Sequence, residues 1–294
     1  MIFYLGTHEP TWLGTVDVPL FLSYHRMYDR LEKGRKSAFR PAKAQWALDS
    51  GGFTELDNYG KWTIPPKQYV KSVLRYRDEI GMLDWCAPQD WMCEDRILRK
   101  TGLSVRIHQD RTIQSYLDLK AMAPDLPVAP VLQGWLLQHY LEHIEAWERA
   151  GVDLRQEPIV ALGTMCRRQD TLRASWIVRE IAERGIRAHA LGAKVTGLGT
   201  YSSLIASSDS LAWSMHALKQ HLTYSPHCHH KDDGPCNNCR DWALAWRESD
   251  VLTFAVPPAG APLAEAEKAS LEKGSRVRAE HGGAPLAPFG RTHG

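Results

Sequence analysis

The chain has 294 residues, of which 44% are hydrophobic and 24% are charged, and its formal net charge is only +2. This length fits one large domain or two small ones, and the small net charge confines any binding of a phosphate backbone to local basic clusters. No apolar run approaches the roughly 18 residues of a membrane-spanning helix, and the first ten residues lack the basic start and apolar core of a signal peptide. Six cysteines do not suggest a disulfide scaffold in a chain of this size, so we expect a protein of the reducing cytoplasm.

Short apolar runs recur along the chain, and each ends in small or polar residues. Most of them are too continuous in apolar residues to be half-exposed hairpin strands, so they predict buried strands of a parallel sheet. The eight predicted strands cover residues 2–7, 18–23, 46–52, 82–90, 128–134, 159–165, 187–193 and 202–209.

Helical patterns separate several of these strands, at residues 68–80, 115–122, 137–150 and 171–184. Strands that alternate with helices indicate an α/β protein with a parallel sheet, and eight such units predict a (β/α)8 TIM barrel. We expect the barrel to span residues 1–257 and to include a zinc-binding segment at 224–242. Residues 258–294 are rich in Ala, Pro, Gly, Glu and Lys, which predicts a tail that is partly helical or disordered.

Polar residues and glycines gather at the ends of the predicted strands, where the active site of a TIM barrel lies. Asp49, Asp90 and Asp209 each stand at the end of a strand, and a carboxylate in such a place is a candidate nucleophile or general acid/base. For Asp49, a capping role in the turn that follows is the alternative interpretation.

The motif that begins at Asp49 continues as Ser50-Gly51-Gly52-Phe53. A glycine pair lets the backbone approach a ligand closely and take conformations that other residues avoid. Phe53 offers an aromatic stacking face, and Leu191 offers an apolar one. The alternative for both side chains is a place in the core.

Other strand ends carry groups that suit a planar, hydrogen-bonding ligand. The carboxylate of Asp90 can accept paired N–H donors from a purine such as guanine. The amide of Gln133 and the backbone of Gly134 and Gly163 can add further hydrogen bonds to the same ligand. Taken alone these glycine and glutamine signals are weak, because Gln-Gly is a common dipeptide.

A dense group of metal-ligand residues follows the last predicted strand, in the pattern C-x-H-x5-C-x2-C. Its members are Cys228, His230, Cys236 and Cys239. Three thiolates and one imidazole are the composition of a closed, four-coordinate structural zinc site. His227 and His229 remain alternatives to His230. A catalytic zinc is disfavoured because a full shell leaves no open position for water.

The motifs LDSGGF, VLQG, ALG and SSDSLAW, with the Cys/His cluster after them, resemble the tRNA-guanine transglycosylase superfamily in order and approximate spacing over about residues 1–245. The opening segments YLGTHEPTWL and PLFLSYHRM are most similar to its DNA-modifying branch, the DpdA-like proteins of phages and bacteria. This resemblance implies an enzyme that exchanges guanine in DNA for a 7-deazaguanine, such as a preQ0-like base.

The resemblance also implies a role for each matching position. Asp209 corresponds to the aspartate that attacks C1′ and forms a covalent glycosyl intermediate, and Asp49 to the general acid/base. The positions that would recognise or enclose the base are Ser50, Gly51, Phe53, Asp90, Gln133, Gly134, Gly163, Leu191 and Gly192. The partners implied are DNA and a free 7-deazaguanine base, with a homodimer as a possible assembly.

Three departures from the family pattern matter: the second puts the identity of the metal ligands in doubt, and the third weakens a tRNA substrate. Thr54 stands where tRNA enzymes commonly have Gln, the zinc pattern differs from the usual C-x-C-x2-C with a distant His, and the chain lacks room for the RNA-binding domains of archaeal relatives. A tRNA-guanine transglycosylase with the same chemistry is the first alternative. The others are a non-catalytic, zinc-stabilised nucleic-acid-binding barrel and a barrel hydrolase with paired carboxylates.

Overall fold

In the computed structural model, residues 1–31, 40–165, 171–226, 228, 230 and 234–252 are described. The predicted tail at 258–294 lies outside them, as do the alternative metal ligands His227 and His229.

Eight strands form one parallel sheet in the order β4-β3-β2-β1-β8-β7-β6-β5. At the two ends of this order, Cys86 of β4 pairs with Val128 just before β5, and the amide of Cys86 donates to the carbonyl of Pro127 at 2.9 Å. The sheet therefore curls until its edge strands meet. The strands are β1 (Ile2–Gly6), β2 (Leu20–Ser23), β3 (Trp46–Asp49), β4 (Leu83–Cys86), β5 (Val131–Leu132), β6 (Val160–Leu162), β7 (Ala188–Ala190) and β8 (Ser207–Ser210).

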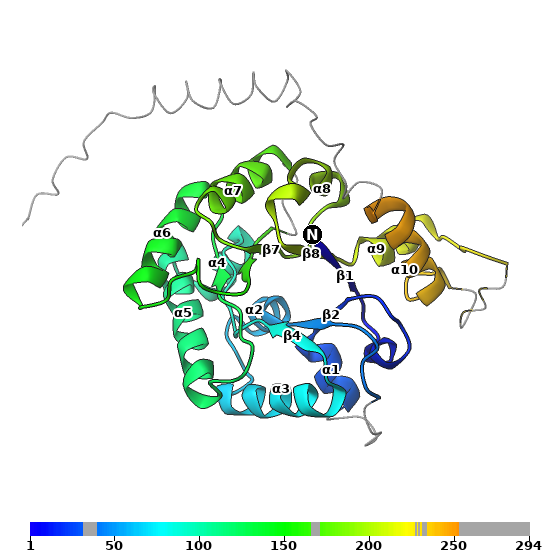
Figure 1. Cartoon of the computed structure of the whole chain (residues 1–294), viewed down its shortest axis with the longest axis horizontal. Helices are drawn as coiled ribbons and strands as arrows, with labels where there is room; N and C mark the ends of the chain where they lie inside the picture. The colour runs from blue at the N-terminus through cyan, green and yellow to red at the C-terminus, as the bar shows by residue number, and fades with distance from the viewer. Residues whose placement is uncertain (32–39, 166–170, 227, 229, 231–233, 253–294) are drawn as a thin grey trace, which may run out of the picture. The chain divides into compact units, whose positions relative to one another are not determined.

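Helices surround these strands, as Figure 1 shows, and the predicted α/β barrel is confirmed. The α-helices are α1 (Tyr24–Leu31), α2 (Gly52–Tyr59), α3 (Pro66–Ile80), α4 (Asp95–Thr101), α5 (Val105–Met122), α6 (Leu137–Arg149), α7 (Thr171–Glu183), α8 (Val195–Tyr201), α9 (Ala212–Gln220) and α10 (Arg240–Trp246). Among the described residues there are also the helical segments η1 (Pro10–Gly14), η2 (Ser202–Leu204) and η4 (Arg247–Val251). None of the helices in the described part of the chain combines the length and apolar character that a bilayer crossing requires.

The predicted elements are correct in kind and differ in length. The strand predicted at 202–209 is shorter, because its first residues form η2 and the ladder to β1 begins only at Ser207. The helix predicted at 115–122 begins earlier, at Val105, where the hydroxyl of Ser104 accepts from the amide of Ile107 and caps it. The polar first half of α5 hides this start in the sequence, since its buried Gln109 and Thr112 bond to loops rather than forming an apolar stripe.

Alternation along the short strands directs their buried side chains to two sides of the sheet. One side of each strand packs against the helices and contributes most of the apolar core. The other side faces the barrel interior, where the buried hydrophobic residues are Tyr4, Phe21, Ala47, Trp85, Ala87, Ala129, Val131 and Ala161. A filled interior is usual in barrels of this size, so chemistry is confined to the two mouths.

Candidate active site and metal centre

The three predicted acids converge at the mouth where the parallel strands end. Asp49 is the last residue of β3, Asp209 lies in β8, and Asp90 follows β4 by four residues. Their proximity is evident from Asp49, whose pKa is raised by the charges of both Asp90 and Asp209. Residues far apart in the sequence therefore share one electrostatic environment.

Asp49 has the properties of a proton carrier. Burial raises its pKa from 3.8 to about 7, the charges on Asp90 and Asp209 add to the rise, and a hydrogen bond from the amide of Gly51 opposes it. That amide lies 2.9 Å from Oδ2 of Asp49. Gly51 makes the contact with a φ of +82°, and a Cβ there would lie 2.4 Å from a ring carbon of His25, so the position requires glycine. A pKa near 7 suits a group that must both give and take a proton.

Asp90 is held from both sides by neutral donors. The hydroxyl of Ser50 donates to its Oδ1 and the amide of Gln133 donates to its Oδ2, both at 2.6 Å. Burial raises the pKa of Asp90, and these two hydrogen bonds oppose the rise. The structure thus brings together Ser50, Asp90 and Gln133, but it directs these groups at one another. A ligand that binds Asp90 has to replace at least one of these two hydrogen bonds.

Thr164 completes the network and was missed in the sequence. Its hydroxyl donates to Oε1 of Gln133 at 2.7 Å and accepts from the amide of Cys93 at 3.1 Å. Thr164 has a φ of 59°, which is rare for a β-branched residue and marks a strained position beside the network. The only sequence signal was its place directly after the predicted site residue Gly163.

Gly163 and Gly134 are required by packing. A Cβ on Gly163 would lie 2.3 Å from the amide nitrogen of Gln133, and one on Gly134 would lie 2.9 Å from side-chain atoms of His139 and Tyr140. The carbonyl of Gly163 accepts from the hydroxyl of Tyr140 at 2.7 Å. A side chain at position 163 would therefore displace Gln133, and one at position 134 would displace His139 or Tyr140.

Asp209 is only 6% exposed and is bonded through one of its oxygens. Oδ1 accepts from the amide of Gly192 at 2.7 Å and lies 3.1 Å from Nε2 of His189. Gly192 takes a φ of +59°, which turns its amide towards the carboxylate. His189 was not singled out in the sequence. Its signal is strand alternation, because it points opposite to its alanine neighbours and into the barrel.

The two side chains expected to sandwich a base lie in different clusters. Phe53, on α2, packs with Leu56 and Trp91. Leu191 packs against the cluster that fills the barrel interior. Both are partly buried, so each keeps some exposed surface.

The four predicted metal ligands are assembled between α9 and α10. One donor atom from each of Cys228, His230, Cys236 and Cys239 lies within 4.8 Å of all the others, and this group could hold a metal ion. Sγ of Cys228 and Sγ of Cys239 are 3.8 Å apart, and Nε2 of His230 is 3.1 Å from Sγ of Cys236. The cluster packs on Ala217, Leu222 and Trp242.

The profile of the family described as DpdA, DeoxyPurine in DNA protein A, matches residues 1–272. The chain belongs to the DpdA family. No curated protein matches it. The matched range includes all three acids and the metal cluster, so the DpdA match supports a transglycosylase-like role in DNA modification.

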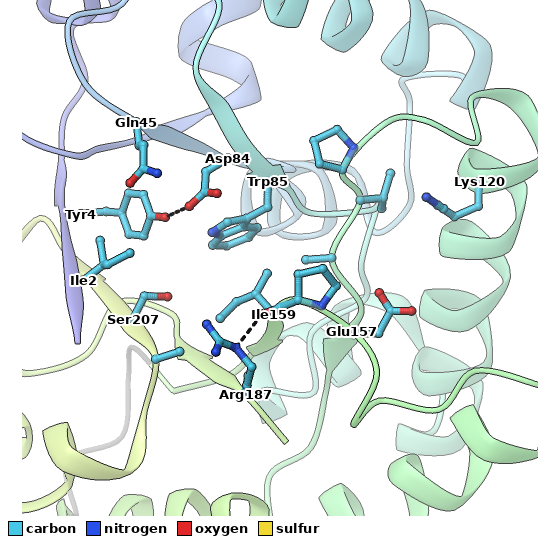
Figure 2. A pocket seen from close by; sticks show the side chains of 15 residues that line it. Ile2, Tyr4, Gln45, Asp84, Trp85, Lys120, Glu157, Ile159, Arg187 and Ser207 are labelled. Carbon is cyan, nitrogen blue, oxygen red and sulfur yellow. Dashed lines mark hydrogen bonds between the residues drawn. The ribbon is translucent and has the colours of Figure 1, made fainter. Parts of the chain in front are cut away.

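The opposite mouth of this DpdA barrel, where the strands begin, contains a cavity of about 310 Å³ (Figure 2). Its polar lining includes Asp84, Lys120, Glu157, Arg187 and Ser207. Asp84 accepts a hydrogen bond from the hydroxyl of Tyr4, and Nε of Arg187 donates to the carbonyl of Pro158 at 3.1 Å. The cavity was not predicted, because the residues that line it come from the starts of strands widely separated in the sequence.

Proposed function

We propose that this DpdA-family chain is a DNA-guanine transglycosylase, a pentosyltransferase that exchanges guanine in DNA for a 7-deazaguanine of the preQ0 type. The observation that carries the proposal is the convergence of Asp209 with Asp49, whose pKa of about 7 fits a proton carrier, at the mouth where barrel enzymes react. The family match supports the same substrate class.

In the first step, Asp209 attacks C1′ of the target nucleoside. An Asp209–C1′ ester bond forms, the bond from C1′ to guanine breaks through an oxocarbenium-like transition state, and protonated Asp49 gives its proton to the departing base. In the second step, ionised Asp49 takes a proton from the incoming base, whose nitrogen attacks C1′ and releases the Asp209 carboxylate. Two inversions give net retention.

Recognition of the base is assigned to the network around Asp90. A guanine edge presents N–H donors and a carbonyl acceptor, which complement the carboxylate of Asp90 and the amide of Gln133. Both groups are buried, so they reject a base that cannot replace their present hydrogen bonds. A base in duplex DNA has to be flipped out to reach them, at a cost of a few kcal/mol.

Polymer specificity is tested with the purified chain, a labelled 7-deazaguanine, and either duplex DNA or tRNA. We expect label in DNA and not in tRNA, read by mass spectrometry of the digested nucleosides. Label in tRNA alone would favour the tRNA enzyme. Label in neither polymer, with DNA binding unchanged when Asp49 and Asp209 are both replaced, would favour a non-catalytic nucleic-acid-binding barrel.

We assign the metal cluster to one structural Zn²⁺. A tetrahedron with Zn–S bonds of about 2.3 Å has sulfur atoms about 3.8 Å apart, which is the separation between Cys228 and Cys239. Zinc would hold the segment between α9 and α10, where the indole of Trp242 donates to the carbonyl of Trp213 at 3.0 Å. Because four ligands close the shell, the acids at the mouth carry the chemistry.

Replacement of Cys236 by serine is expected to remove bound zinc and to lower the melting temperature by roughly 5 °C or more. Zinc content by elemental mass spectrometry and thermal unfolding check this result. Cys86→Ala is the control, since Cys86 is a buried thiol outside the cluster, and it should keep one zinc per chain. Unchanged zinc in Cys236→Ser would contradict the assignment.

A further inference from the structure

The side chain of His189 contacts Asp209, and the proposed chemistry has given it no role. It lies in β7 with no exposed surface, and three aromatic side chains surround its ring. Its ring stacks on Phe21 at 5.5 Å and meets the edges of Trp85 at 4.7 Å and Tyr4 at 5.8 Å between centroids. A buried imidazole among aromatic rings needs hydrogen bonds for both ring nitrogens, because an unmet polar group costs stability.

Both nitrogens of His189 have partners in β8. Nε2 lies 3.1 Å from Oδ1 of Asp209, and Nδ1 lies 2.8 Å from Oγ of Ser207. An ionised carboxylate only accepts, so Nε2 must carry a hydrogen, and in a neutral ring the Ser207 hydroxyl must donate to Nδ1. Ser207 also lines the cavity at the start of the strands (Figure 2), so His189 lies between that cavity and Asp209.

The two donors to Asp209 leave its oxygens unequal. Nε2 of His189 and the amide of Gly192 both meet Oδ1. With Oδ1 held in this way, the side chain cannot rotate freely, and Oδ2 is the oxygen presented for bond formation. A reacting group that is misplaced by about 1 Å can lower the rate by about 10²-fold, so the position of Oδ2 matters for the reaction.

We propose that His189 is a positioning residue, which donates from Nε2 to Oδ1 of Asp209 and so presents Oδ2 to C1′. This inference rests on the proposed function. When Oδ2 bonds to C1′, the negative charge leaves Asp209 and Oδ1 becomes the ester carbonyl. When the incoming base attacks C1′, the Oδ2–C1′ bond breaks, and the charge-assisted hydrogen bond to Oδ1 stabilises the departing carboxylate.

Two variants of similar size separate positioning from packing. His189→Gln keeps an N–H donor near the place of Nε2, whereas His189→Leu removes it. We expect kcat for exchange to fall on the order of 10²-fold in His189→Leu, with KM for the base unchanged, and most of the rate to return in His189→Gln. Equal loss in both variants, or no loss in either while the wild-type chain exchanges bases, would overturn the inference and leave the proposed function standing.

A measurement that needs no activity tests the hydrogen bond itself. In ¹⁵N-histidine spectra, the signal that disappears in His189→Gln is assigned to His189, and we expect the tautomer with hydrogen on Nε2. Asp209→Ala should shift that proton. The Nδ1–H tautomer, or a signal insensitive to Asp209→Ala, would overturn the inference. No exchange by the wild-type chain would contradict the proposed function, and these spectra would then still decide the hydrogen bond.

Discussion

Asp209→Asn is expected to lower the rate of guanine exchange by on the order of 10⁴-fold or more, since an amide cannot form the glycosyl ester. The fold should persist. Asparagine has nearly the same size, and its oxygen can still accept from Gly192 and His189, which now meet Oδ1 of the aspartate. The measurement is the rate of label exchange into DNA. Mass spectrometry for a covalent protein–DNA adduct is the second measurement, and we expect the adduct in the wild-type chain and none in Asp209→Asn.

A matched control is available at the other mouth of the barrel. Asp84 is an exposed acid bonded to the hydroxyl of Tyr4, and Asp84→Asn makes the same chemical change away from the proposed site. It should leave exchange within about twofold of wild type. If Asp209→Asn exchanged bases as fast as Asp84→Asn does, Asp209 would not be the nucleophile.

Asp49→Asn is expected to make the protein more stable at pH 8 while impairing exchange. The folded-state pKa of Asp49 is about 7, against an ordinary value of 3.8. Between these two pH values the folded chain keeps a proton that the unfolded chain has released, so this group's contribution to stability falls as pH rises and stays low above pH 7. A shift of this size corresponds to a penalty of at most about 4 kcal/mol in the free energy of unfolding. Asp49 is partly exposed, so contact with solvent lowers the penalty below this limit.

Asparagine does not titrate, so the variant escapes this penalty. Urea unfolding at pH 4 and pH 8 should show little difference from wild type at the lower pH and a gain of about 1–4 kcal/mol at the higher pH. The same gain at both pH values would mean that Asp49 does not titrate as described. Exchange should fall by roughly 10²–10⁴-fold, the usual value of a general acid/base. Stability is thus given up for reactivity at this position.

In the wild-type chain, formation of the glycosyl intermediate should slow as pH rises through about 7, because protonated Asp49 is the acid for the departing guanine. Asp49→Asn should remove that inflection. Single-turnover rates of the wild-type chain and of Asp49→Asn, measured between pH 5.5 and 8.5, check both statements.

The sequence alone was sufficient for the barrel and for its acids. Eight continuous apolar runs predict buried parallel strands, and acids at their ends predict a site, because carboxyl ends of parallel strands meet at one mouth. Asp49 and Asp209 follow from that rule without coordinates. The metal cluster is equally local, since Cys228, His230, Cys236 and Cys239 lie within twelve residues of one another in the printed sequence.

Only the tertiary structure decided which polar groups bond to one another. Thr164, Gln133 and Asp90 come from three separate strand ends, and their network depends on the register and on a left-handed backbone at Thr164. His189 is likewise one polar residue in a strand of three, and its contact with Asp209 exists because β7 and β8 pair with His189 opposite Ser207. A short strand has too few residues for alternation to identify its partner, so such contacts are settled by pairing in space.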